Sequence, residues 1–355
     1  MRKKIQGSSI NITDFDKPNH SKKYSPSFVY SPKFEISPCF DCMAEMVAYT
    51  GKDDYQSLMH KVNKPFLTHK NLKEVSFFGN KLMMRKWIKG LIPLEEMLGS
   101  SSRLLEESEI KRLFQIVVNA VKNQQEFIIK PANGSESIET LKVYFDNGKL
   151  KSKFLNPKNG DKGMGDSKKV ISDYNTFCEW IELRILTNTV GKIDTHLSDI
   201  EPGLIIQTLF SHPKEVRGPI EMKFFTAWGE LLFVGLRNGG GVCLGKEGEY
   251  LKGDRDTFDA LHRMFFHELK KNTLALARAS TVPNLRCDFF VDIRSGSWVL
   301  NEMALLPDVS SYPGYILEDT GKFFHKGWVD KVYKHTPSSL TITQLRKRLT
   351  TEIKV

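Results

Sequence analysis

The stretch that decides the fold runs from Glu126 to Tyr144, EFIIKPANGSESIETLKVY, in which a lysine ends an apolar run and a polar segment follows at once. The apolar run predicts a strand, and LKVYF at 141–145 predicts a second one. A lysine at a strand end, before a loop with exposed backbone amides, can hold nucleotide phosphates by a point charge and a cradle of donors. Most strand-end lysines are simply solvated, so Lys130 by itself leaves both interpretations open.

The segments around this stretch alternate between helical and extended patterns. EESEIKRLFQIVVNAVKNQQ at 106–125 spaces its apolar residues as a helix does, with acids in the first turn and a lysine in the last. A second long amphipathic helix is expected after the glycine-rich loop that ends at Arg255, and a tight hairpin turn is expected at 146–148. Further strands are predicted at 203–210, 220–228, 231–237, 285–293 and 297–306.

Composition describes a folded protein that favours anionic partners. The 355 residues are 40% hydrophobic, enough for two or three lobes, and 52 lysines and arginines against 42 acids leave a net charge of +10. That charge favours nucleotides, inositol phosphates, nucleic acid or acidic lipid. No apolar run approaches the roughly 20 residues that span a bilayer, and the basic start lacks the core of a secretory signal. We expect a cytoplasmic protein with a loose basic tail at 1–28. Basic and aromatic residues do not alternate along that tail, so nucleic acid is not an expected partner.

The cysteines do not predict a disulfide framework, because their number, five, is odd. Cys39 and Cys42 have the CxxC spacing of half a zinc site, but no second CxxC or close CxxH accompanies them, and a turn at a helix start is the simpler interpretation. The histidines show no clustered spacing, and no Ser-His-Asp or Cys-His arrangement indicates a protein nucleophile.

A second group of charged residues lies in RCDFFVDIRSGSWVLNEM at 286–303. Strand alternation places Arg286 and Asp288 on one face, and if the faces of the two strands coincide, Asp288 and Glu302 lie opposite each other. Two carboxylates on apolar strands are costly unless neutralised, and Mg²⁺ with nucleotide phosphates is a natural partner for them. The alternative is that one acid points to solvent and the other forms a salt bridge with Arg286.

The remaining candidate site residues are supported only by the order in which they occur along the chain. Gln207 and Leu209 can offer an amide and an apolar surface to an adenine, although 203–210 can equally be a plain core strand. Lys223 is a candidate for phosphate or ribose contact, or else a solvated strand lysine. Arg237, at the start of the NGGG loop, can face an acceptor, or the loop can serve only to shape the backbone.

This order of motifs resembles the ATP-grasp superfamily over about residues 80–315. NKLMMRKWIKGLIP (80–93) is similar to the segment that leads into the ATP-binding lobe of D-alanine:D-alanine ligases, which implies that Arg85 reaches the phosphates. FIIKPANGSESIETLKV looks like the phosphate-loop strand, LIIQTLF like the adenine hinge, and RCDFF with VLNEMALLP like the metal-binding end of the site. EMKFFTAWGELLF is similar to the teichuronopeptide branch of the superfamily.

The resemblance implies an α+β, ATP-grasp fold in which two α+β lobes clamp ATP. It implies an N-terminal α/β lobe at 29–100, a small lobe with the phosphate loop at 101–205, a C-terminal lobe with the metal site at 206–340, and a helix or tail at 341–355. The implied ATP contacts are Arg85, Lys130, Ser135, Ser137, Gln207 and Leu209; the implied Mg²⁺ ligands are Asp288 and Glu302; the implied catalytic residues are Arg286, Lys223 and Arg237.

The implied activity is ligation of a carboxylate to an amine through an acyl phosphate, on small-molecule or peptide substrates. Two alternatives stay open. One is an ATP-grasp kinase acting on a polyanionic alcohol such as an inositol phosphate, which the net charge favours; the other is a nucleotide-binding protein without catalysis. The sequence indicates neither the acceptor nor an oligomeric state.

The chain departs from the family pattern in its metal site and phosphate loop. Ala304 stands where these enzymes usually carry an asparagine, two residues after the second acid, which puts a second metal ion in doubt. Asn301 is not expected to replace it, because alternation points its side chain to the opposite face. Glu136 and Glu139 stand where small residues are common, and an acid there repels a triphosphate.

Overall fold

The computed structural model describes residues 80–133, 139–155, 167–186, 202–210, 219–237, 241–280, 282, 284–305, 316, 321, 323 and 341–354. The expected basic tail, most of the expected N-terminal lobe, the CxxC pair, and Ser135, Glu136 and Ser137 lie outside these residues. Among the described residues, no helix has both the length and the apolar character needed to cross a membrane.

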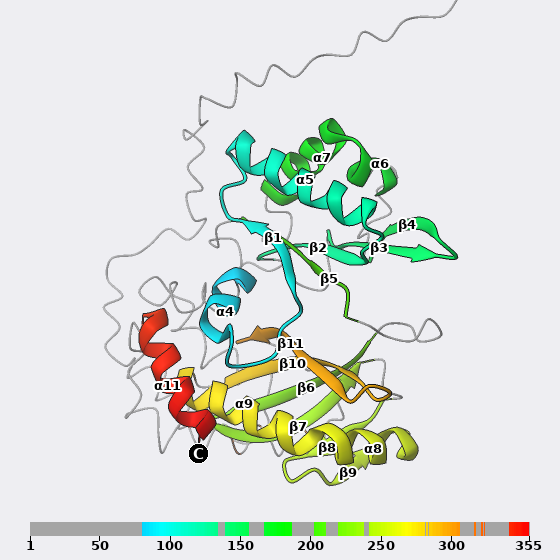
Figure 1. Ribbon diagram of the computed structural model, residues 1–355. Coiled ribbons are helices and arrows are strands. Elements are labelled where there is room, and N and C mark those ends of the chain that lie inside the picture. Colours follow the sequence, from blue (N-terminus) through cyan, green and yellow to red (C-terminus); the bar gives the residue numbers. More distant parts are fainter. Residues whose placement is uncertain are drawn as a thin grey trace, which may run out of the picture.

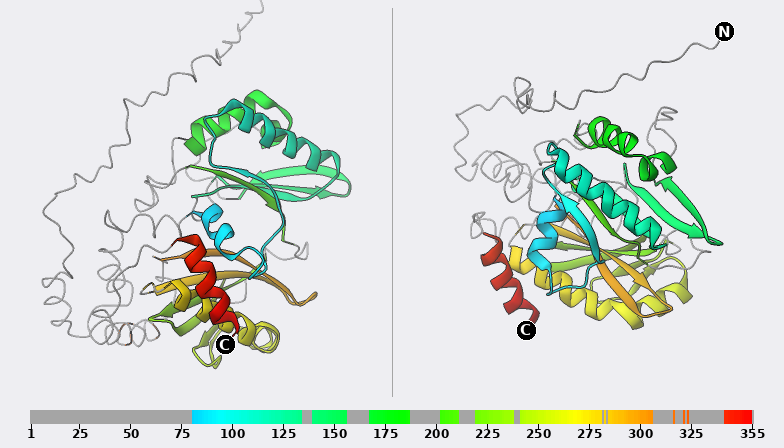
Figure 2. Two further views of the ribbon diagram at one scale, coloured as in Figure 1. Left: turned by 60° about the vertical axis from the view of Figure 1, so that its left-hand side comes forward. Right: turned by 45° about the horizontal axis from the view of Figure 1, so that its top comes forward.

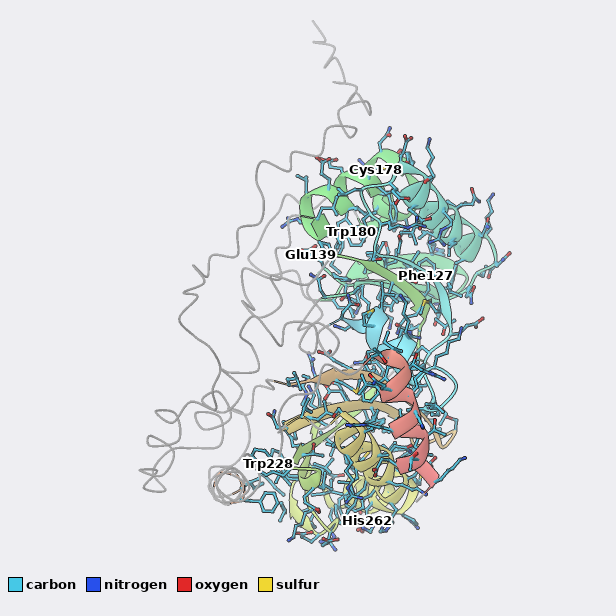
Figure 3. The ribbon with its side chains drawn as sticks, turned by 90° about the vertical axis from the view of Figure 1, so that its left-hand side faces the viewer. Phe127, Glu139, Cys178, Trp180, Trp228 and His262 are labelled. Atoms are coloured by element: carbon cyan, nitrogen blue, oxygen red, sulfur yellow. The ribbon has the colours of Figure 1, made fainter. Side chains whose placement is uncertain are left out.

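The first lobe is a five-stranded antiparallel sheet covered by helices on one face (Figure 1). Its core combines the helix positions Leu113, Val117 and Trp180 with the strand positions Phe127 and Ile129. Figure 3 labels Phe127 and Trp180 within this lobe. In sheet order the strands are β1 (Met97–Ser101), β5 (Leu204–Thr208), β2 (Phe127–Pro131), β3 (Leu141–Asp146) and β4 (Lys149–Phe154), and the helices are α5 (Glu107–Lys122), α6 (Ser167–Ser172), α7 (Tyr174–Trp180) and the π-helix η3 (Ile181–Leu186).

The second lobe is a six-stranded antiparallel sheet whose apolar face packs on helices. The strand residues Phe224, Cys287, Phe289 and Leu300 are fully buried in this core. In sheet order the strands are β11 (Ser297–Ala304), β10 (Asn284–Asp292), β6 (Ile220–Ala227), β7 (Glu230–Arg237), β8 (Cys243–Gly245) and β9 (Tyr250–Lys252), and the helices are α8 (Arg255–Leu261), the π-helix η5 (His262–Phe266), α9 (His267–Ser280) and α11 (Ile342–Lys354).

The short helix α4 (Lys81–Ile88) connects the two lobes. It begins at Asn80, whose side-chain oxygen accepts from the backbone N–H groups of the first turn, 2.9 and 3.3 Å away. The Lys81 N–H donates to the carbonyl of Ala132, next to the end of β2, at 2.8 Å. Helix α4 also buries Met84, Trp87 and Ile88 in the core of the second lobe. The helix therefore connects the end of β2 with that lobe.

These elements confirm the predicted α+β class, and the predicted hairpin turn joins β3 to β4 with Asn147 and Gly148 at φ 51° and 72°. The expected division at 205/206 falls inside β5, all of whose residues belong to the first sheet. β1, β4, β8 and β9 were not predicted, because these strands are short or half exposed and lack an apolar alternation. The strands expected at 220–228 and 231–237 left residues 229 and 230 for a turn. The turn lies one residue earlier, at Trp228 and Gly229, both with positive φ, in the second lobe (Figure 3).

Candidate active site

Charged residues from both sheets and from α4 lie together between the lobes. Figure 2 shows the two sheets facing each other with α4 beside them. We call this group the inter-sheet cluster. Strand alternation explains why it forms: Phe127 and Ile129 point into the first core, so Lys130 points the other way, and Met222, Phe224, Cys287 and Phe289 point into the second core. The cluster consists of Lys81, Lys130, Glu221, Lys223, Arg286, Asp288, Asn301 and Glu302.

Three of its residues form a row across the second sheet, because Asp288 of β10 pairs in register with Lys223 of β6 and with Glu302 of β11. The expected juxtaposition of the two acids is thus present. The salt bridge kept as an alternative is present too: Arg286 donates from Nε and Nη2 to the two carboxylate oxygens of Asp288, at 2.6 and 2.7 Å. Lys223 Nζ lies 3.5 Å from Asp288 Oδ2, so this buried carboxylate faces two cations.

Opposite charges shift the pKa values of Arg286 and Glu302 toward the ionised forms. Burial opposes the charge of Arg286, but Asp288 and Glu302 outweigh that effect and raise the pKa of Arg286. Burial likewise opposes ionisation of Glu302, yet the fields of Lys81, Arg286 and other cations leave its pKa below the ordinary value. Lys81 Nζ lies 3.9 Å from Glu302 Oε2. Lys81 therefore joins the cluster from α4, a contact that sequence reasoning did not identify.

The prediction that Asn301 faces away from the site is wrong, because β11 contains a bulge. Asp288 pairs with Glu302 but the next residue, Phe289, pairs with Leu300, so Asn301 is an extra residue on β11. Leu300 and Met303 are both buried in the core, and the two residues between them are free to point toward the first lobe. Asn301 Oδ1 accepts from Lys130 Nζ at 3.2 Å. A spacing of three between apolar residues, in place of two, was the available sequence signal.

Glu221 is a third acid in the cluster that sequence reasoning missed. It precedes Lys223 by two residues on β6 and accepts a hydrogen bond from Asn301 Nδ2 at 3.1 Å, and its other oxygen lies 3.4 Å from Lys223 Nζ. Burial, with the neighbouring charge of Asp288, raises the pKa of Glu221. An acid two residues before Lys223, on the same face of the mostly apolar strand IEMKFFTA, was the signal that could have identified it.

Lys130 is nearly buried, with 7% of its surface exposed. Burial, reinforced by the like charges of Lys81 and Arg85, lowers the pKa of Lys130 to about 8, although Glu95 and Glu302 oppose the shift. The surroundings stabilise the charged form of Lys130 poorly, so an anionic ligand would stabilise this ammonium strongly. This is the property expected of a phosphate-binding lysine.

Arg85 and Gln207, both implied to touch the nucleotide, contact each other in a buried cluster. Arg85 Nη1 donates to Gln207 Oε1 at 3.2 Å and lies 3.5 Å from Glu95 Oε2, and Arg85 Nη2 donates to the Glu95 carbonyl. Burial lowers the pKa of Arg85, while Glu95 opposes the change. Glu95, a buried acid between α4 and β1, was not singled out from the sequence.

The remaining predicted residues lie at the edges of the site or outside it. Leu209, just after β5, is half-buried and its N–H donates to the Glu126 carbonyl at 3.2 Å. Arg237 is exposed at the end of β7, and within the described part of the chain its side chain makes no hydrogen bond or ion pair. Glu139 lies 3.9 Å from Arg184, so the repulsive charge expected in the phosphate loop is countered.

The donor chemistry fits a magnesium ion held by few protein ligands. No group of three or more His, Cys, Asp or Glu side chains in the described residues could hold a metal ion. Asp288 and Glu302 are nevertheless cross-strand neighbours, and a carboxylate has lone pairs beyond those that the bidentate Arg286 uses. Mg²⁺ is usually held by one or two carboxylates together with substrate phosphates and waters, which matches this pair.

No protein-family model and no curated protein matches the chain, and comparison with solved structures finds several that are similar in part. D-alanine–D-alanine ligase from Bacillus anthracis, complexed with ATP, matches with a TM-score of 0.36 and 14% identity, over 77% of this chain and 69% of that one. D-cycloserine synthetase DcsG matches with a TM-score of 0.35 and 14% identity, over 78% and 71%. The ATP-grasp ligase PsnB, complexed with a minimal precursor, matches with a TM-score of 0.34 and 7% identity, over 79% and 61%.

Proposed function

We propose that this protein is an ATP-dependent ligase that joins a carboxylate to an amine through an acyl phosphate. The observation that carries the proposal is the inter-sheet cluster, in which the ammonium of Lys130 from one sheet reaches β11 beside the carboxylates of Glu302 and Asp288. A nearly buried ammonium opposite paired acids suits a polyphosphate accompanied by a divalent cation. Small-molecule or peptide carboxylates and amines are the proposed substrates, and we expect the enzyme to act in the cytoplasm, where ATP is available.

Lys130 has the proposed role of binding the α- and β-phosphates, because it ends a strand directly before the glycine-containing loop. Arg286 is fixed by its two hydrogen bonds to Asp288, and a guanidinium fixed in this way can stabilise charge on the transferred phosphoryl group without reorganising. Lys223, between Glu221 and Asp288, is oriented by two carboxylates and adds a second positive charge on the same sheet face.

Asp288 and Glu302 would hold Mg²⁺, which when bound neutralises phosphate charge and aligns the γ-phosphoryl group for in-line transfer. A substrate carboxylate oxygen attacks the γ-phosphorus and the bond to ADP breaks. The amine then attacks the acyl carbon, phosphate leaves, and the nitrogen loses a proton to form the amide. The chain's residues act by positioning and by charge, and no protein nucleophile is required.

Hydroxylamine trapping tests the proposal. The protein is incubated with ATP, Mg²⁺, hydroxylamine and pooled carboxylates, and hydroxamate formation with stoichiometric ADP is expected. Asp288→Asn should abolish the product, whereas Asp259→Asn, on the exposed surface of α8, should not. ADP release that never yields hydroxamate with any carboxylate would refute the ligase.

A kinase acting on a polyanionic alcohol is the second candidate, and the net charge of +10 favours it. In the same incubation it would transfer phosphate to an inositol phosphate with no need for an amine. The alternative of a nucleotide-binding protein without catalysis was suggested by Ala304, which stands where ATP-grasp enzymes usually carry an asparagine. The amide of Asn301 weakens this reason, because it provides a polar group in the cluster. Failure to release ADP with either acceptor class, despite ATP binding, would favour that alternative.

A further inference from the structure

The bulge in β11 places Asn301 between the two lobes, in contact with a charged residue on each side. Its amide oxygen accepts from the ammonium of Lys130 in the first lobe at 3.2 Å. Its amide nitrogen donates to the carboxylate of Glu221 in the second lobe at 3.1 Å. Lysine can only donate, so its partner must be the amide oxygen, and the amide nitrogen is left to donate to Glu221.

Asn301 is the hydrogen-bond partner of Lys130 among the described residues. The charged groups around the ammonium are Lys81 and Arg85 from α4, Glu95 from the segment after α4, and Glu302 from β11. Neither of the two acids lies within ion-pair distance of Lys130 Nζ. A neutral amide oxygen therefore holds the ammonium. A carboxylate at this position would neutralise the charge, whereas an amide leaves it available to an anionic ligand.

We infer that Asn301 is a positioning residue for nucleotide binding: it fixes the Lys130 ammonium beside the second sheet, and Glu221 fixes Asn301 in turn. This inference rests on the proposed function, since it assumes that Lys130 binds the phosphates. The bulge is the structural device, because regular alternation from Glu302 would have turned Asn301 toward the apolar core and Leu300 out of it.

A double-mutant cycle tests this role. ATP affinity is measured by calorimetry in EDTA, without metal, for the wild type, Asn301→Ala, Lys130→Met and the double variant. Loss of a hydrogen bond to a charged group predicts that Asn301→Ala weakens ATP binding about tenfold or more. If Asn301 acts through Lys130, the same change in the Lys130→Met background should have no further effect. Asn119→Ala is the matched control, since Asn119 is an exposed asparagine that also accepts one side-chain hydrogen bond.

Two results would overturn the inference. Equal losses in both backgrounds would mean that Asn301 acts independently of Lys130. A loss that appears only when Mg²⁺ is added would mean that Asn301 acts through the metal ion instead. If the alanine variant does not fold, Asn301→Ser, whose hydroxyl still accepts and donates, should show a smaller loss in the same cycle.

A measurement made without nucleotide distinguishes failure of this inference from failure of the proposed function. The acetylation rate of Lys130 by acetic anhydride is followed by mass spectrometry, and it should rise several-fold in Asn301→Ala and Glu221→Gln but stay unchanged in Asn119→Ala. If the wild type binds no ATP but the two variants show this rise, the proposed function is refuted and the contact is kept. An unchanged rate in protein that does bind ATP would refute the positioning role alone.

Discussion

Replacing Lys130 by methionine should stabilise the folded protein at neutral pH while it removes nucleotide binding. The lysine is 7% exposed, and burial together with Lys81 and Arg85 lowers its pKa from 10.5 to about 8. A depressed lysine pKa means that the folded state is a poor environment for the charged form. Methionine has a similar length without the charge, so it removes this cost and keeps the packing.

The size and sign of the effect follow from linkage. The change from 10.5 to about 8 corresponds to about 3 kcal/mol at 1.36 kcal/mol per pH unit. Below pH 8 both states carry the proton and the full cost is present. Between pH 8 and 10.5 the unfolded state binds more protons, so the free energy of unfolding of the wild type rises with pH, and above 10.5 the cost is absent. The advantage of Lys130→Met should therefore shrink over this range.

Urea unfolding at neutral pH and above pH 10.5 measures the difference between variant and wild type, with Lys149→Met on the exposed part of β4 as control. We expect a higher midpoint with an unchanged slope for Lys130→Met at neutral pH, and no change for the control. The assignment of a costly buried charge would be refuted if Lys130→Met were less stable than the wild type. It would also be refuted if the difference in unfolding free energy between the two did not depend on pH. Retained ATP affinity would remove Lys130 from the nucleotide site.

The other predictions concern the metal site, the buried arginine and the loop backbone. Glu302→Gln should abolish Mg²⁺-dependent ADP release but keep ATP binding measured in EDTA, and turnover at the wild-type rate would contradict the metal assignment. Arg85→Met should destabilise the fold by about 3–5 kcal/mol because it leaves Glu95 buried without its cation; in urea unfolding, adding Glu95→Gln should restore most of that loss. Gly253→Ala should destabilise strongly, since φ is +109° and a Cβ would lie 2.4 Å from a backbone atom. Gly148→Ala, with φ +72° and open space, should cost only about 1 kcal/mol, and equal melting temperatures for the two would count against the backbone clash.

Local patterns predicted the parts of this fold that depend on neighbouring residues in the chain. The helical spacing of Ile110, Leu113 and Val117 predicted α5, because one face of a helix repeats every three to four residues. The turn at Asn147 and Gly148 was predictable because few residues tolerate positive φ. Alternation likewise placed the charged residues of β10 on the face away from the core.

The partners of those charged residues could not be predicted in the same way. Glu95 reaches Arg85 from a connecting segment without periodicity, and Lys81 reaches Glu302 only because α4 packs against the second lobe. Both contacts join residues whose separation along the chain says nothing of their distance in space.

The sequence by itself determined that a strand-end lysine, an apolar hinge strand and two acids follow one another in the order typical of ATP-grasp enzymes. It also determined that Asp288 lies on a strand face away from the core, since alternation is a property of the single strand. Only the tertiary structure decided that Lys223 and Glu302 flank Asp288, that Glu221 joins the site, and that Asn301 bridges the lobes. The physical reason is that a bulge and a contact between strands depend on register and packing, and one residue of slippage changes the face on which a side chain lies.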